Sequence, residues 1–174
     1  MKRSLLSVAI LGALASACGY ALVGRGVTTD PSIKRIGVPL FKDKTGKPGL
    51  DARVTQAVIE ELLKRGRFVI VKEITNVDAV VEGEITGFNV VPVNFSGTSG
   101  QTQASRYAIT LTANVLYRKV GQKEPLWSNE AFSLRDEYDM GDNATAYFDR
   151  EGQSIDRLAT GFARSLVAAM LEAF

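Results

Sequence analysis

The most regular pattern in the chain reads Arg106-Tyr107-Ala108-Ile109-Thr110-Leu111-Thr112-Ala113-Asn114-Val115-Leu116-Tyr117-Arg118-Lys119. Apolar or aromatic residues occupy every odd position from 107 to 117. Because successive side chains of a β-strand point to opposite faces, this alternation predicts a long strand with one buried face. Turn-forming residues follow at 121–125, and a second alternating stretch returns over 126–138. The two stretches predict a long β-hairpin.

Shorter stretches predict the remaining strands. Alternating or β-branched residues favour strands over 33–41, 68–72 and 78–91. Proline has no amide hydrogen for a sheet, so Pro39 predicts that the first strand lies at an edge or is interrupted there. Pro92 is expected to end the third strand, and a polar loop with one aromatic residue is expected over 94–103.

Apolar residues at three- and four-residue spacing predict two helices, over 50–65 and 151–172. In the first, Asp51 lies in the first turn and Lys64 and Arg65 lie in the last, where they complement the helix dipole. The order of elements predicts an α+β fold: a two-layer sandwich with a mixed, mostly antiparallel four- to five-stranded sheet and two helices packed on one face.

The N-terminus has the pattern of a secretory signal. Lys2 and Arg3 precede an apolar run over 5–14, which is too short to span a bilayer. Small residues at 15–17 lead to Cys18, the single cysteine of the chain. This arrangement resembles a bacterial lipobox, although Ala15 stands where leucine is usual. The resemblance implies cleavage before Cys18 and acylation of that residue; the alternative is an ordinary secretory signal that leaves a free thiol.

These features predict three parts: a lipoprotein signal peptide over 1–17, a lipidated tether over 18–31 and a single α+β domain over 32–174. Gly19 follows the cysteine, where an aspartate would mark retention in the inner membrane. By resemblance to sorted lipoproteins, we expect the protein to be lipid-anchored at the periplasmic face of the outer membrane.

Composition argues against an enzyme. The chain has no histidine, and its one cysteine is assigned to the lipid, so the usual general base and the common metal ligands are missing. No phosphate-binding GxxxxGK[ST] loop is present. We therefore expect no catalytic residue, no metal and no cofactor. Without residues 1–17 the basic and acidic residues balance, which gives no case for a nucleic-acid partner.

An ordered set of short motifs resembles the LPS-assembly lipoprotein family, the LptE type. The motifs are Cys18-Gly19-Tyr20-x-Leu22-x-Gly24, Ile33-Lys34-Arg35-Ile36-x-Val38-Pro39-x-Phe41, Pro48-Gly49-Leu50-Asp51, Asp78-Ala79-x-Val81-x-Gly83-x-Ile85, Tyr107-x-Ile109, Leu126-Trp127 and Leu158-Ala159-x-x-Phe162-Ala163. The resemblance implies a plug subunit inside an LptD-type outer-membrane β-barrel that helps to insert lipopolysaccharide. Because the second motif also occurs in lipoproteins that activate peptidoglycan synthases, activation of such an enzyme is the alternative.

Several residues are candidates for contacts with these partners. Phe95 is a candidate barrel contact, or it folds back on its own domain. Four basic residues at strand or loop ends are candidate lipopolysaccharide contacts, namely Arg106, Lys34, Arg35 and Arg150. Since no acidic residue lies within 94–105, Arg106 is expected to carry an uncancelled charge, and Arg106→Glu is expected to weaken lipopolysaccharide binding.

Two other features have ordinary explanations. The acidic residues Asp136, Glu137, Asp139 and Asp142 do not follow a calcium-loop pattern and are read as a solvated loop. Trp127 is read as a packing residue.

Overall fold

A computed structural model describes residues 30–96, 103–139 and 144–172, with only the backbone described for 144–149. The elements are β1 (Arg35–Gly37), β2 (Lys42–Asp43), α2 (Leu50–Lys64), β3 (Val69–Val71), β4 (Ala79–Ser96), β5 (Gln103–Lys119), β6 (Trp127–Asp139) and α3 (Ala144–Glu172). They form an α+β fold, as the sequence predicts. The sheet has the order β3-β1-β4-β5-β6, and β2 pairs with β4 as a sixth short strand.

The long hairpin predicted from residues 106–119 lies within a three-stranded antiparallel ribbon. β5 pairs with β4 from Lys119 opposite Ala79 to Gln103 opposite Ser96. Along its other side β5 pairs with β6, from Tyr117 opposite Trp127 to Arg106 opposite Asp139. The odd-numbered side chains of β5 from Ile109 to Tyr117 are buried in the core, which confirms the face predicted from the alternation.

The predicted strand over 33–41 is interrupted at Pro39. β1 ends at Gly37 and β2 begins at Lys42, and neither strand includes the proline. β1 is nevertheless not an edge strand, because it lies between β3 and β4 and runs parallel to both. Of the two possibilities that Pro39 allowed, the structure therefore selects the interruption.

The predicted end of a strand at Pro92 is wrong, because β4 continues to Ser96. The register of β4 against β5 shifts between Pro92 and Asn94 and again between Asn94 and Phe95. A bulge leaves one residue outside regular pairing, so a proline beside it does not break the strand. Residues 94–96, predicted as part of a loop, consequently belong to the hairpin.

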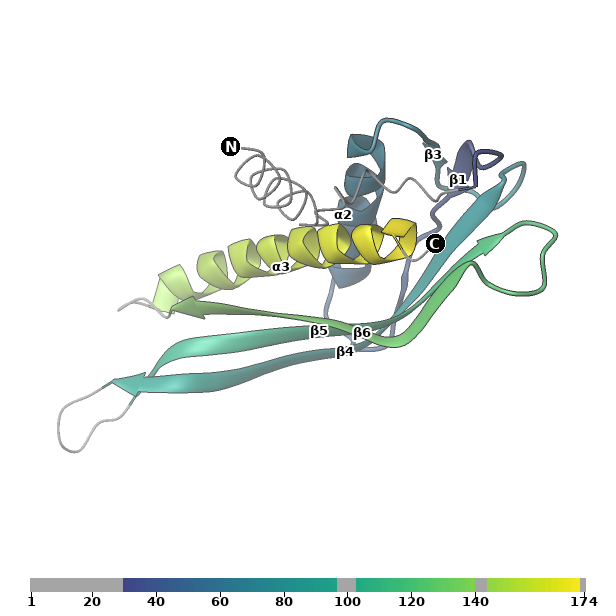
Figure 1. Cartoon of the computed structure of the whole chain (residues 1–174). Coiled ribbons are helices and arrows are strands. Elements are labelled where there is room, and N and C mark those ends of the chain that lie inside the picture. The colour runs from purple at the N-terminus through teal and green to yellow at the C-terminus, as the bar shows by residue number, and fades with distance from the viewer. Residues whose placement is uncertain (1–29, 97–102, 140–143, 173–174) are drawn as a thin grey trace, which may run out of the picture.

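Both helices cover the same face of the sheet, as Figure 1 shows. α2 ends one residue before its predicted end, whereas α3 begins at Ala144, seven residues before its predicted start at 151. The core between the layers is formed by buried side chains of every layer, among them Ile36, Val58, Leu62, Ile85, Leu111, Phe162 and Leu166. Neither α2 nor α3, the two helices among the described residues, lies on the opposite face of the sheet.

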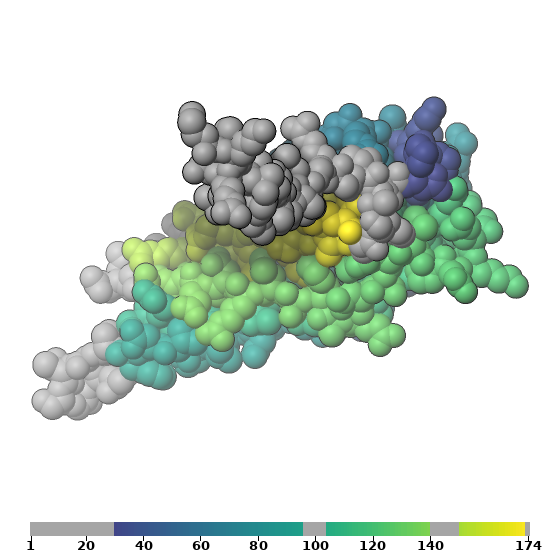
Figure 2. All heavy atoms as spheres, viewed as in Figure 1, coloured from purple at the N-terminus to yellow at the C-terminus, as the bar shows by residue number. Residues whose placement is uncertain are grey.

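The domain has two distinct ends. At one of them the β4–β5 hairpin projects beyond the rest of the molecule, as the teal arm in Figures 1 and 2. We call this the hairpin end and define it by Asn94, Arg106 and Asp139, which adjoin across three strands. β1 and β3 lie at the other end, which we call the entry end and define by Asp30, Lys34, Arg67, Asp78 and Lys119.

Candidate functional site

A cluster of charged side chains occupies the hairpin end, where β5 and β6 meet the first turns of α3. Arg106 and Asp139 are direct cross-strand neighbours, and the Arg106 Nε lies 2.7 Å from an Asp139 carboxylate oxygen. The Glu137 carboxylate lies 4.0 Å from the same guanidinium group. The hydrogen bond to Asp139 raises the pKa of Arg106, so this side chain remains charged at any physiological pH.

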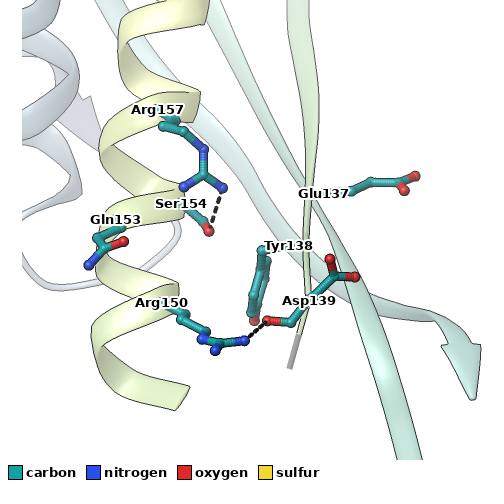
Figure 3. Close-up of a pocket in the computed structure, with 7 residues that line it drawn as sticks. All are labelled: Glu137, Tyr138, Asp139, Arg150, Gln153, Ser154 and Arg157. Carbon is teal, nitrogen blue, oxygen red and sulfur yellow. Dashed lines mark hydrogen bonds between the residues drawn. The ribbon is translucent and has the colours of Figure 1, made fainter. Parts of the chain in front are cut away.

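A shallow pocket of about 240 Å³ lies beside this pair, between the end of β6 and α3 (Figure 3). Its lining residues are Glu137, Tyr138, Asp139, Arg150, Gln153, Ser154 and Arg157. Arg150 donates a hydrogen bond to the Asp139 carbonyl oxygen at 3.2 Å, and Arg157 donates one to the Ser154 hydroxyl at 2.9 Å. Asp139 therefore holds Arg106 through its carboxylate and Arg150 through its main chain.

Further ion pairs extend the cluster along β6. Arg157 lies 3.5 Å from the Asp136 carboxylate, and Arg135 lies 2.8 Å from Glu137. Four arginines and three carboxylates thus share this end among the described residues, with a net charge of +1. Exposed guanidinium groups in such an arrangement are suited to binding phosphate or carboxylate groups in two-pronged hydrogen bonds.

The structure brings together only two of the four basic residues named from the sequence. Arg106 and Arg150 meet at Asp139, whereas Lys34 and Arg35 lie at the entry end. There the backbone amides of Lys34 and Arg35 donate to the Asp78 carboxylate at 2.9 and 2.8 Å. At the usual rise of a strand, the thirteen residue-to-residue steps of β5 from Arg106 to Lys119 separate the two ends by about 40 Å.

The expectation of an uncancelled charge on Arg106 is wrong. The loop after β4 contributes no carboxylate, but Asp139 arrives from the neighbouring strand. Reasoning from the sequence also missed Arg157, Gln153 and Ser154, because the helical pattern does not show which residues of α3 lie beside the end of β6. Counting the register of β5 against β6 from Tyr117 opposite Trp127 would place Tyr138 opposite Arg106, and the register shift between Ala113 and Val115 brings Asp139 there instead.

The remaining residues named from the sequence lie outside this charged cluster or outside the described residues. Phe95 lies near the end of β4 with 57% of its surface exposed, so it does not fold back into the core. Trp127 packs edge-on against Phe132 with ring centroids 6.0 Å apart, which confirms its packing role. No group of three or more potential metal ligands occurs in the described parts of the chain. Cys18 and Asp142 lie outside the described residues.

Comparison with known proteins identifies the family. A family model described as LptE, lipopolysaccharide-assembly, matches residues 33–170. The chain belongs to the LptE family. No curated protein matches the sequence, and none of the helices in the described ranges is long and apolar enough to cross a membrane.

Solved structures support the fold of this LptE-family chain. A candidate lipoprotein from Caulobacter crescentus is similar at a TM-score of 0.51 and 8% identity, covering 76% of this chain and 89% of that one. A hypothetical protein from Chlamydia trachomatis has a TM-score of 0.51 and 11% identity, over 82% and 100% of the two chains. A Xanthomonas campestris protein has a TM-score of 0.53 and 13% identity, over 80% and 84%. At these identities the likeness concerns architecture alone.

Proposed function

We propose that the protein is an outer-membrane lipoprotein, anchored through Cys18, that serves as the plug subunit of a lipopolysaccharide translocon. The observation that carries this proposal is the LptE family match over residues 33–170. The lipobox-like sequence before Cys18 supports the anchor. The match is to a lipopolysaccharide-assembly family, and therefore it does not favour activation of a peptidoglycan synthase. In this role the protein has no catalytic activity.

The uncovered face of the sheet suits a partner with a polar lumen. Its side chains are mostly polar or charged and include Glu82, Glu84, Thr110, Thr112, Asn114, Arg118, Ser128, Ser133 and Arg135. Large outer-membrane β-barrels have a polar interior. An LptD-type barrel is the proposed partner, and exposed Phe95 on the projecting hairpin is a proposed contact with it.

The arginine cluster at the hairpin end is the proposed contact with lipopolysaccharide. Lipid A carries phosphate groups, and Arg106 and Arg150 present exposed guanidinium groups from two different elements around Asp139. Lys34 and Arg35 cannot join this contact, because they lie at the other end of the sheet.

Affinity purification with mass spectrometry tests the proposed partner. The full chain, extracted from membranes, should recover a large β-barrel in equimolar amount, and its intact mass should show a chain that begins at an acylated Cys18. Recovery of a cell-wall synthase without a barrel would overturn the proposal in favour of the alternative. A chain that carries no lipid or is cleaved elsewhere would overturn the anchor.

Replacement of Arg106 by glutamine tests the lipopolysaccharide contact. Arg106→Gln removes the positive charge without placing a third carboxylate beside Asp139 and Glu137, as Arg106→Glu would. The variant loses a charge-assisted hydrogen bond to a phosphate group, so its affinity for lipopolysaccharide should fall below that of the parent chain. Lipopolysaccharide binding is measured at low salt, where charge contacts are strongest.

Arg53→Gln is the matched control for Arg106→Gln. Arg53 is also exposed and paired with a carboxylate, but its partner is Asp156, whereas Arg106 pairs with Asp139 and lies near Glu137. The Arg53→Gln variant should bind lipopolysaccharide with the same affinity as the parent chain. Equal affinities for both variants would exclude Arg106 from the contact.

A further inference from the structure

A second concentration of basic residues lies at the entry end. Two basic stretches that are far apart in the sequence meet there: Lys34-Arg35 at the start of β1, and Lys64-Arg65-Gly66-Arg67 between α2 and β3. Val69 pairs with Arg35 across the parallel strands, and its amide donates to the Lys34 carbonyl oxygen at 2.8 Å. The sheet topology therefore places both stretches side by side on one end of the domain.

Positive charge outweighs negative charge at this end. Within 30–35, 61–69, 76–82 and 118–127 there are eight basic residues, Lys34, Arg35, Lys64, Arg65, Arg67, Arg118, Lys119 and Lys123. The five acidic residues are Asp30, Glu61, Asp78, Glu82 and Glu124, so the net charge is +3.

The acidic residues of the entry end are mostly paired or hydrogen-bonded, whereas four of its eight basic residues form no ion pair within the described residues, namely Lys34, Arg35, Arg67 and Lys123. Asp30 pairs with Lys119 at 2.6 Å, and Glu82 pairs with Arg118 at 3.1 Å. Glu61 lies within 3.6 Å of both Lys64 and Arg65, and Asp78 accepts the two backbone amides of β1. Lys34 and Arg67 are exposed and have no carboxylate partner among the described residues.

The polypeptide also enters the domain at this end. The Lys119 ammonium group binds both the Asp30 carboxylate and the Ser32 hydroxyl, the latter at 2.7 Å, which fixes the first described residues to the end of β5. The chain from Cys18 to Thr29 is twelve residues long and can span at most about 40 Å. A lipid on Cys18 would therefore keep the entry end within about 40 Å of the bilayer surface.

We propose that the entry end docks on the anionic phospholipid surface to which the chain is tethered, through Lys34, Arg67 and the basic residues around them. The proposal rests on the lipid anchor at Cys18, which supplies the proximity. A basic cluster near an anionic membrane is attracted within about a Debye length, and each lysine or arginine there improves partitioning about fivefold. Docking turns the hairpin end away from that leaflet, with the arginine cluster roughly 40 Å distant along β5.

Hydrogen exchange on the full lipidated chain tests the docking. The chain is reconstituted in phosphatidylcholine vesicles with or without phosphatidylglycerol, and exchange is followed in peptides that cover 30–35 and 64–69. These peptides should be protected only in vesicles that contain phosphatidylglycerol, and high salt should remove the protection. In Lys34→Glu/Arg67→Glu the ratio of docked to undocked protein should fall at least about 25-fold, because two favourable charges are lost.

Lys42→Glu/Arg164→Glu is the matched control. It makes the same change in net charge at two exposed residues that lie outside the ranges counted for the entry end and have no carboxylate partner among the described residues. It should keep the parent chain's protection. Equal loss of protection in both variants would show a general charge effect and would overturn the assignment to this end.

The remaining outcomes separate the docking from the proposed function. If the mass spectrum shows lipid on Cys18 but exchange is the same in both vesicle types, the docking is wrong and the anchor stands. If Cys18 carries no lipid, the anchor is wrong, and salt-sensitive co-sedimentation of the same chain with phosphatidylglycerol vesicles decides the docking. Protection by lipopolysaccharide vesicles and not by phosphatidylglycerol would overturn the choice of phospholipid.

Discussion

At Gly83, on β4, the aromatic ring of Phe41 occupies the space that a β-carbon would take. Phe41 follows the interruption at Pro39 and is buried in the core, where its backbone amide donates to the Thr55 hydroxyl of α2. The glycine is therefore required for close approach of a ring and not for an unusual backbone angle. This contact explains why the residues around Pro39 can leave the sheet and still be covered.

Gly83→Ala should destabilise the protein. The added methyl group overlaps the Phe41 ring, and relief requires movement of a tightly packed aromatic side chain, at a cost of about 1–3 kcal/mol. Denaturant unfolding measures the change in the free energy of unfolding. Gly152→Ala is the control: nothing lies within 4 Å of the added carbon, and in this helical position alanine should stabilise by up to about 1 kcal/mol. Unchanged stability of Gly83→Ala would refute the close packing of Phe41.

The Asp30–Lys119 contact should make stability depend on acidity. The hydrogen bond from Lys119 lowers the pKa of Asp30 from 3.8 to about 2. The folded state therefore favours the charged carboxylate, and its contribution is complete above pH 3.8 and is lost as the pH falls towards 2. Between pH 3.8 and pH 2, the free energy of unfolding should fall less steeply with falling pH in Asp30→Asn and in Lys119→Met than in the parent chain. Parallel slopes in all three proteins would contradict the contact.

The sequence indicated two of the arginines at the candidate site, but it did not indicate the carboxylate with which they interact. Arg106 and Arg150 were named because they stand at strand or loop ends, and in the structure both form hydrogen bonds with Asp139. Their shared partner Asp139 depends on the register of two strands, which no property of Arg106 itself reveals. Lys34 and Arg35 were grouped with them only because the sheet order was unknown.

At the scale of elements, α2 is fastened to the chain segment between β1 and β2 through one side chain. Thr55 is buried, accepts the Phe41 amide at 2.9 Å and donates to the Asp51 carbonyl oxygen at 2.7 Å. The hydroxyl thus satisfies a backbone amide that has left the sheet at the Pro39 interruption. A buried amide without a partner is costly, so this single side chain links helix position to the path of the strand segment.

Thr55→Val tests this link. Valine keeps the shape of the side chain but leaves the Phe41 amide unpaired, which should lower the free energy of unfolding by about 1–3 kcal/mol. Thr160→Val is the matched control, since Thr160 in α3 also donates to the carbonyl oxygen four residues earlier, at 2.8 Å, but is exposed. Its stability should change by less than about 0.5 kcal/mol. Equal effects in the two variants would show that the Phe41 amide does not depend on Thr55.

The elements themselves were largely predictable, because period-two and helical patterns report burial directly. The strand at 106–119 and the helix at 50–65 are the strongest cases. The continuation of β4 past Pro92 was not predictable, since it depends on register shifts that free the proline from regular pairing. The early start of α3 was missed because residues 144–150 lack the apolar periodicity seen after Ile155. Strand order was beyond reach, because β1 pairs in parallel with strands far along the chain.

At the scale of the whole molecule, the two ends of the sheet differ in chemistry. The sequence from Gly87 to Ser105 contains no charged residue, and the described part of this hairpin exposes Val91, Val93 and Phe95. The entry end carries the basic cluster and the tether. A protein that lies between a bilayer surface and a membrane-embedded partner would present its ends to different surroundings.

A photo-crosslinking residue placed at either end should therefore report different neighbours. In place of Phe95 it should crosslink to the proposed β-barrel partner, because this side chain is 57% exposed on the projecting hairpin. In place of Val120, which is 47% exposed in the turn at the entry end, it should crosslink to phospholipid instead. The crosslinked products are identified by mass spectrometry. Barrel adducts from position 120 alone would reverse the proposed orientation.

The placement of β1 between β3 and β4 bears on the order in which the chain folds. β4, β5, β6 and α3 follow one another in sequence and contact their neighbours, so they can assemble by closing short loops. β1 has no strand to pair with until β3 has been made, and its parallel pairings with β3 and β4 close much longer loops. We therefore expect the C-terminal half to nucleate folding while the segment nearest the tether remains unstructured. Such an order keeps the N-terminal part extended during synthesis, which suits the export through a membrane that the proposed lipoprotein anchor requires.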